Sequence, residues 1–266
     1  MNNYNLDTFK AYLDTKWLGN AAMYFEEVDS TNNIIRNYAE TGSEEGLLVF
    51  ADVQNAGRGS HGRSWSSPGG SGVWTSFLLR PESKAQNMFG LSELVALAIA
   101  NTLKDIYSID AKIKWPNDVY INNRKISGIL VEMETEGNKV DFIDVGVGIN
   151  VLTETFPEEL RDKASSILIE TGRELDRVLL LTQILKKFEG YYESLVKNGD
   201  LSEFMEEFNN LLIHKDKKIR LTRGLEKSEL VKEVISEGID SQGRLICLED
   251  NGKRTYVTNG EVSVNL

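Results

Sequence analysis

A glycine-rich loop between residues 54 and 72 carries the residues best suited to chemistry. It holds six glycines together with Arg58, Arg63 and Trp65. Glycine has no Cβ, so backbone N–H groups can approach a ligand closely. Arginine brings a permanent charge in a forked donor geometry that suits phosphate or carboxylate. Glycine and serine also make up flexible linkers, but the arginines and the tryptophan favour a loop that wraps an anionic, partly aromatic small molecule.

Two further segments place polar side chains at the ends of expected elements. Ser30, Thr31 and Asn32 stand where a helix should begin, so their hydroxyls and amide would lie beside outward-pointing N–H groups. A plain helix cap is the alternative interpretation. Residues 114–118, KWPND, end an expected strand with a cation, an amide and a carboxylate. Beside a phosphate loop this segment would suit Mg²⁺ through oxygen ligands, although it could also be only a turn.

Lys125 and Gly128 lie inside an apolar stretch that predicts a strand. Glycine weakens the interior of a strand, so its presence at 128 indicates that another group approaches the backbone there. Lys125 could be an active cation in the same place or only a charge that protects a sheet edge.

The composition excludes several classes of function. The chain of 266 residues has a net charge of −11, which argues against nonspecific binding to nucleic acid or to a membrane surface. Cys247 is the only cysteine, which excludes an intramolecular disulfide and a cysteine zinc cluster. The N-terminus lacks the features of a signal peptide, and the apolar run at 94–100 is far too short to span a membrane. We therefore expect a cytoplasmic protein.

The periodicity predicts an α+β fold with a mixed, largely antiparallel sheet, because consecutive strands are separated by hairpin turns. Strands are expected at 22–28, 46–53, 73–79, 111–115, 119–121, 125–134 and 139–150. Helices are expected after residue 30 and at 87–107, 157–169, 174–197 and 201–213. After residue 214 come short strands with close turn signals, 228–239 and 261–266 among them, which suggest a small β-barrel. We expect two domains, 1–214 and 215–266.

Together these segments resemble the biotin protein ligase family, from about residue 5 to the C-terminus. The resemblance rests on five motifs in order, with GEVSV (260–264) as a closing strand: DSTN (29–32), Gln54 with GRGxxGRxW (57–65), KWPNDV (114–119), RKISGILVE (124–132) and GVGIN (146–150). It implies a catalytic domain in 1–214 like those of lipoate ligases and class II synthetases. It also implies an SH3-like β-barrel in 215–266.

The resemblance implies a reaction in two steps. The carboxylate of biotin attacks the α-phosphate of ATP, which gives biotinyl-5′-AMP and pyrophosphate. A lysine amine on the biotin carrier domain of a biotin-dependent carboxylase then attacks this mixed anhydride and releases AMP. The first step brings two anions together, so cations and Mg²⁺ must neutralise them. A loop that closes over the site would exclude water and protect the anhydride.

The resemblance also implies overlapping roles for the motif residues. The catalytic residues would be Lys125, Arg58 and Asp118, and Asp118 could also accept the proton of the acceptor lysine. The biotin site would comprise Ser30, Thr31, Asn32, Gln54, Arg58, Gly59, Ser60, Lys125 and Gly128. The ATP site would comprise Arg58, Arg63, Trp65, Lys114, Asn117, Lys125 and Asn150. Mg²⁺ would be held by Asn117 and Asp118.

The sequence departs from the family pattern at two places, and it leaves three alternative functions open. Many members have an arginine where this chain has Ser60, so we expect weaker retention of the adenylate. Similarity to the catalytic domain begins almost at Met1, so we expect no helix-turn-helix domain, and no nucleic acid or membrane partner. The rivals are a lipoate-type ligase, a biotin-binding sensor or repressor without ligation, and a simple phosphate-binding domain. The family contains monomers and dimers, which leaves a homodimer open.

Overall fold

The computed structural model describes residues 4–222, 231–258 and 260–263. The expected strand residues 228–230 and 264–266 lie outside these ranges. None of the helices in the described part has the length and apolar composition to cross a bilayer.

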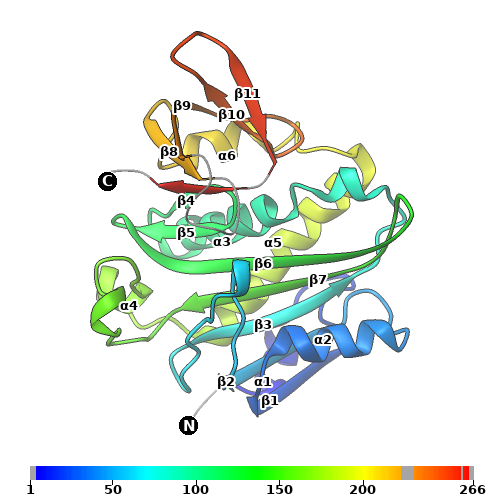
Figure 1. Cartoon of the computed structure of the whole chain (residues 1–266). Helices are drawn as coiled ribbons and strands as arrows, with labels where there is room; N and C mark the ends of the chain where they lie inside the picture. The colour runs from blue at the N-terminus through cyan, green and yellow to red at the C-terminus, as the bar shows by residue number, and fades with distance from the viewer. Residues whose placement is uncertain (1–3, 223–230, 259, 264–266) are drawn as a thin grey trace.

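A seven-stranded mixed sheet forms the centre of the molecule (Figure 1). Only the pair β1–β2 is parallel, and every other neighbouring pair is antiparallel. The expected mixed, largely antiparallel sheet is thereby confirmed. From one edge to the other the strands are β1 (Ala22–Val28), β2 (Leu48–Gln54), β3 (Gly72–Leu79), β7 (Lys139–Asn150), β6 (Arg124–Glu136), β5 (Asp118–Ile121) and β4 (Lys112–Lys114).

Helices cover the two faces of this sheet unequally. The long helices α3 (Leu91–Tyr107) and α5 (Arg177–Asn198) pack together on one face, behind the sheet in Figure 1. The apolar side chains between them and the sheet form the main core. On the other face α2 (Thr31–Glu40) packs against β2, β3 and part of β7. The short helix α1 (Leu6–Tyr12) contacts α5 and β1.

Glycines hollow out the part of the second face that α2 leaves uncovered. Side chains alternate along a strand, and Ile129, Val145 and Ile149 point into the main core. The alternate positions on β6 and β7 include Gly128, Gly146 and Gly148, and Gly128 pairs directly with Gly148 across the two strands. Three missing side chains on neighbouring strands leave space over the sheet for a loop and a ligand.

A second sheet of five strands follows in the C-terminal part. Its order is β11 (Arg254–Val257), β10 (Leu245–Leu248), β9 (Val231–Ile239), β8 (Lys218–Thr222) and β12 (Glu261–Ser263), and all its pairs are antiparallel. It lies beside β4 and contacts the helix α6 (Met205–Leu211) (Figure 1). This small antiparallel sheet agrees with the expected SH3-like domain, while the boundary at residue 214 stays a prediction.

The expected helix at 157–169 is wrong. A single 3₁₀ turn (Glu158–Leu160) is followed by a further turn at 161–163 and a short extended segment at 164–166, and the short helix α4 begins only at Ile167 and ends at Thr171. The extended chain pairs with β6: the Lys125 N–H donates to the carbonyl of Lys163 (3.0 Å), and the Ser165 N–H donates to the carbonyl of Lys125 (2.8 Å). Long-range pairing with Lys125 therefore overrides the local helical spacing. A 3₁₀ turn also interrupts the glycine-rich loop at Ser60–Gly62.

Candidate active site

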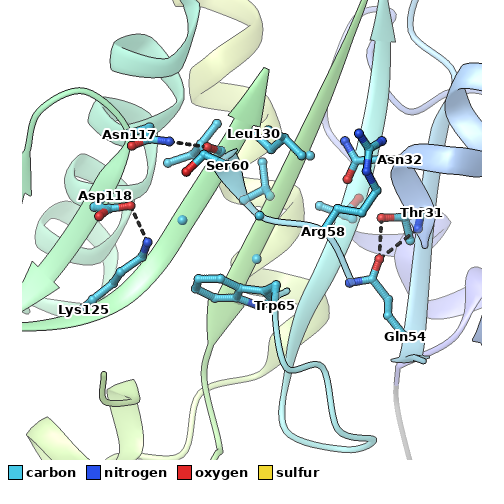
Figure 2. Close-up of a pocket in the computed structure, with 17 residues that line it drawn as sticks. Thr31, Asn32, Gln54, Arg58, Ser60, Trp65, Asn117, Asp118, Lys125 and Leu130 are labelled. Carbon is cyan, nitrogen blue, oxygen red and sulfur yellow. Dashed lines mark hydrogen bonds and ion pairs between the residues drawn. The ribbon is translucent and has the colours of Figure 1, made fainter. Parts of the chain in front are cut away.

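One pocket gathers most of the residues that the motifs single out. It has about 410 Å³ of empty space, part of it open to solvent. It lies between the first turn of α2, the glycine-rich loop, strands β6 and β7, and the turn before β5 (Figure 2). Eleven of the expected site residues line it: Thr31, Asn32, Gln54, Arg58, Gly59, Ser60, Trp65, Asn117, Asp118, Lys125 and Gly128.

A cluster of uncharged polar side chains forms one side of the pocket, where β2 ends beside the start of α2. The Thr31 N–H donates to Gln54 Oε1 at 2.8 Å, and the Thr31 hydroxyl lies 3.1 Å from the same oxygen. Gln54 Nε2 donates to Ser67 Oγ at 2.9 Å. Ser30 occupies the capping position but its hydroxyl makes no capping hydrogen bond, and Gln54 satisfies the free N–H of Thr31 at the start of the helix. These fixed donors and acceptors suit an uncharged polar ligand group.

Arg58 points from the loop onto the sheet and meets a carboxylate there. Its Nη2 lies 2.6 Å from Glu132 Oε1 on β6, and its Nη1 donates to Asn33 Oδ1 at 3.4 Å. The loop holds this position by folding back on itself, since the Gly59 N–H donates to the Arg63 carbonyl and the Trp65 N–H donates to the Gly57 carbonyl. A ligand anion that enters the pocket therefore meets a cation that is already oriented.

Trp65 lies over the hollow that the glycines leave. A Cβ added to Gly148 would come within 2.5 Å of Trp65 Nε1, and one added to Gly128 would come within 2.9 Å of its ring. Any side chain at these positions would therefore displace the indole. The close approach expected at Gly128 is thus made by Trp65, together with the side chain of Lys125. Figure 2 shows the indole between Lys125 and Gln54.

Lys125 and Asp118 form an ion pair on the opposite side of the pocket, with Nζ and Oδ1 2.5 Å apart. Lys125 Nζ also lies 5.2 Å from the centre of the Trp65 ring. Strict alternation would turn Lys125 away from Gly128, but the β5–β6 register shifts at this point. Such a bulge re-aims the side chain, and Lys125 consequently reaches the pocket.

The turn before β5 offers limited ligands for a metal. Asn117 Nδ2 donates to the carbonyl of Ile129 at 2.7 Å, so only its side-chain oxygen could bind a cation. Among the described residues that line the pocket, Asp118 carries the only carboxylate. Within the described ranges, no group of three or more His, Cys, Asp or Glu side chains is arranged so that it could hold a metal ion. This donor set fits Mg²⁺ that arrives with phosphates, because Mg²⁺ commonly combines one or two carboxylates with phosphate oxygens and water.

A buried acid supports the polar side of the pocket, and the motifs did not indicate it. Asp144 on β7 is fully buried and accepts a hydrogen bond from Asn32 Nδ2 at 3.0 Å. Burial raises the pKa of Asp144 to about 6. Gly146, Gly148 and Thr75 were also missed as lining residues. The spacing of two between Gly146 and Gly148 is the signal that could have revealed a bare strand face.

Four expected site residues lie outside the lining of the pocket. Ser30 is buried at the start of α2, and Arg63 donates to Ser60 Oγ at the outer side of the loop. Lys114 Nζ lies 5.8 Å from the centre of the Tyr120 ring. Asn150 Nδ2 donates to the carbonyl of Ser165, which links β7 to the segment before α4. Their roles toward biotin or ATP stay predictions.

The fold and the pocket have counterparts among known proteins. Residues 24–150 match the biotin/lipoate A/B protein ligase family. The bifunctional ligase/repressor BirA of Salmonella typhimurium is 32% identical over 261 residues, an alignment that covers 97% of this chain and 77% of that protein. The chain belongs to the biotin/lipoate A/B protein ligase family. The resemblance inferred from the motifs is therefore confirmed for the family.

Two further relatives show how much of their length this chain matches. The bifunctional ligase/repressor BirA of Bacillus subtilis is 38% identical over 189 residues, which cover 70% of this chain but only 58% of that protein. The chain thus spans less than two thirds of that relative. The biotin protein ligase from Aquifex aeolicus, solved in complex with biotin and ATP, superimposes with a TM-score of 0.76 at 30% identity. That match covers 92% of this chain and 98% of the Aquifex chain.

Proposed function

We propose that this protein is an ATP-dependent biotin protein ligase that attaches biotin to a lysine of a biotin carrier domain. The observation that carries the proposal is that Arg58 and Lys125 line one pocket with the polar pair Thr31 and Gln54. Biotin combines an uncharged ureido ring, which has donors and an acceptor, with a carboxylate. The pocket offers a partner for each part. The Aquifex relative, which was solved with biotin and ATP, supports the same substrates here.

In the first step the biotin carboxylate forms a bond to the α-phosphorus of ATP, and pyrophosphate leaves with the electron pair of the broken P–O bond. Thr31, Asn32 and Gln54 hold the ureido ring at one side of the pocket. Arg58 exchanges Glu132 for the incoming carboxylate, and Lys125 exchanges Asp118 for a phosphate oxygen. Both cations stabilise negative charge that would otherwise keep the reactants apart. Trp65 and the loop exclude water from the anhydride.

In the second step the lysine amine of the carrier domain forms a C–N bond to the biotinyl carbonyl carbon. The C–O bond to AMP breaks, AMP leaves with the electron pair, and the amine proton passes to Asp118. An acceptor of this kind occurs in biotin-dependent carboxylases. Asp118 suits the task because it is a partly exposed carboxylate at the pocket wall.

ATP is the proposed co-substrate, and Mg²⁺ is the proposed metal. Asp118 and the side-chain oxygen of Asn117 would hold Mg²⁺ together with the phosphates, and the ion would neutralise phosphate charge. Arg63, Lys114 and Asn150 remain candidates for contacts to the nucleotide. We place the reaction in the cytoplasm, where ATP and carboxylases are available. A homodimer is also proposed, because β1 is an outer strand of the sheet and could pair with a second copy.

Biotin-dependent exchange of labelled pyrophosphate into ATP tests the first step directly. We expect exchange with biotin and none above background with lipoate. Exchange with lipoate alone would favour a lipoate ligase, a function that the same family includes. Binding of biotin without any exchange would favour the sensor instead and overturn the proposed ligase.

A further inference from the structure

Trp115 connects the ligand pocket to the C-terminal sheet. It is 1% exposed and stands at the start of the turn that carries Asn117 and Asp118 into the pocket. Its backbone N–H donates to His214 Nε2 at 3.2 Å. Its indole N–H donates to the carbonyl of Gly243, just before β10, at 2.9 Å. One residue therefore makes two buried bonds to the C-terminal part of the chain and precedes two pocket residues.

His214 is the middle of a buried polar chain that runs from β9 to this turn. Its Nδ1 lies 2.9 Å from Ser236 Oγ on β9. Because a backbone N–H can only donate, Nε2 must accept from Trp115, and the ring proton must sit on Nδ1, facing Ser236. Burial lowers the pKa of His214 to about 4, which keeps the ring in this neutral form at neutral pH. The Trp115 N–H thus fixes the tautomer, and Ser236 accepts the Nδ1 proton and holds the ring in place.

The chain before His214 attaches to the same region. The Ile213 N–H donates to the carbonyl of Ile113 on β4 at 3.0 Å. On its other side the turn is held by β6, through the two bonds between Asn117 and Ile129. The turn is therefore fixed between the main sheet and the C-terminal sheet, and His214 is a contact from the C-terminal side.

We propose that His214 is a positioning residue through which the C-terminal sheet keeps Asn117 and Asp118 in place for ATP. This inference rests on the proposed ligase function. His214 acts through the backbone of Trp115 and touches no substrate. Thr31, Gln54 and Arg58 are held instead by β2, α2 and the loop, at the other side of the pocket. Loss of the His214 contact therefore weakens the use of ATP and leaves the affinity for biotin unchanged.

Two substitutions of His214 distinguish the hydrogen bond to Trp115 from the hydrogen bond to Ser236. In His214→Gln the side-chain oxygen can take the place of Nε2 and accept from Trp115. In His214→Asn the shorter amide can take the place of Nδ1 and reach Ser236, but it leaves the Trp115 N–H without its acceptor. An unsatisfied buried donor is costly, so we expect His214→Asn to raise the KM for ATP about tenfold in biotin-dependent pyrophosphate exchange. We expect His214→Gln to stay within about threefold of wild type, because its acceptor remains.

A matched control removes a different contact of the C-terminal sheet, the one between α6 and β9. Asn209 on α6 binds Ile239 on β9 through both its amide atoms, at 2.7 and 3.2 Å. We expect Asn209→Ala to lower the Tm while the KM for ATP stays at the wild-type value. Equal rises of the KM in Asn209→Ala, His214→Gln and His214→Asn would overturn the inference, as would a parallel loss of biotin affinity. If His214→Asn does not fold, Ser236→Ala replaces it, and an unchanged KM there would overturn the inference.

Calorimetric affinities for ATP and for biotin keep the two proposals apart. A wild-type protein that binds ATP but supports no exchange would overturn the ligase function. An ATP affinity that is the same in wild type and His214→Asn would overturn the role of His214. A wild type that binds no ATP would overturn both.

Discussion

The substitution Gly148→Ala should displace the Trp65 indole and thereby open the glycine-rich loop. The added Cβ would lie 2.5 Å from Trp65 Nε1 and 2.6 Å from Cε2, whereas non-bonded heavy atoms prefer about 3.5–4.0 Å. The indole must therefore move by about 1 Å. Gly148 lies within β7 and is not among the glycines with positive φ, so the strand itself accepts alanine.

The cost of this clash should fall on ligand binding more than on folding. Overpacking in a rigid core costs about 1–3 kcal/mol, but Trp65 belongs to a surface loop that can move away. The closed position of the loop then becomes less favourable by a similar amount. Because about 1.4 kcal/mol corresponds to a factor of ten, we expect the Kd for biotin to rise about tenfold or more. We expect only a small change in Tm.

Calorimetric titration with biotin measures the effect, and a double-mutant cycle with Trp65→Ala shows its origin. Once the ring is absent, the methyl group meets no indole, so adding Gly148→Ala to Trp65→Ala should change the Kd little. Gly190→Ala in α5 is the control, since a Cβ there meets nothing within 4 Å and affinity should not change. Independent, additive effects of the two substitutions would refute the reasoning.

Three further predictions concern the charges of the site. Arg58→Ala and Lys125→Ala should each lower biotin-dependent pyrophosphate exchange by at least about a hundredfold while the Tm shows an intact fold; exchange at the wild-type rate would remove that residue from the mechanism. The pKa of Asp144 is raised to about 6 in the folded protein, so its carboxyl group ionises more readily in the unfolded chain. Wild type therefore loses stability as the pH rises from about 4 to about 6. Asp144→Asn keeps an oxygen for Asn32 and should gain roughly 2–3 kcal/mol over wild type between pH 4 and pH 7 in urea unfolding; parallel pH profiles would contradict this. Ser60→Arg adds a cation to the pocket wall and should slow the timed release of biotinyl-5′-AMP in the absence of acceptor, whereas equal release would show that Ser60 does not limit retention.

Local patterns predicted the strands and most of the pocket because the signals lie within short segments. The hairpin turns are visible as Asn122-Asn123, where both residues have positive φ, and as Gly137-Asn138. Arginine and glycine in the loop predict an anion site on chemical grounds alone, and this role stays a prediction. Arg58 and Lys125 were expected to share one cavity, and they do.

Long-range pairing accounts for what the sequence did not predict. The bare face of the sheet depends on the register that sets Gly128 opposite Gly148, which no local pattern contains. Lys125 reaches the pocket only because of a bulge. Asp144 supports Asn32 across 112 positions of the chain, so neither residue alone indicated the contact.

The intact mass of an isolated biotin carrier domain, incubated with this protein, biotin and ATP, tests the central proposal most directly. We predict a gain of one biotinyl group on the carrier that requires both substrates and is lost with Lys125→Ala. A carrier domain of unchanged mass, from wild-type protein that demonstrably binds biotin and ATP, would contradict it.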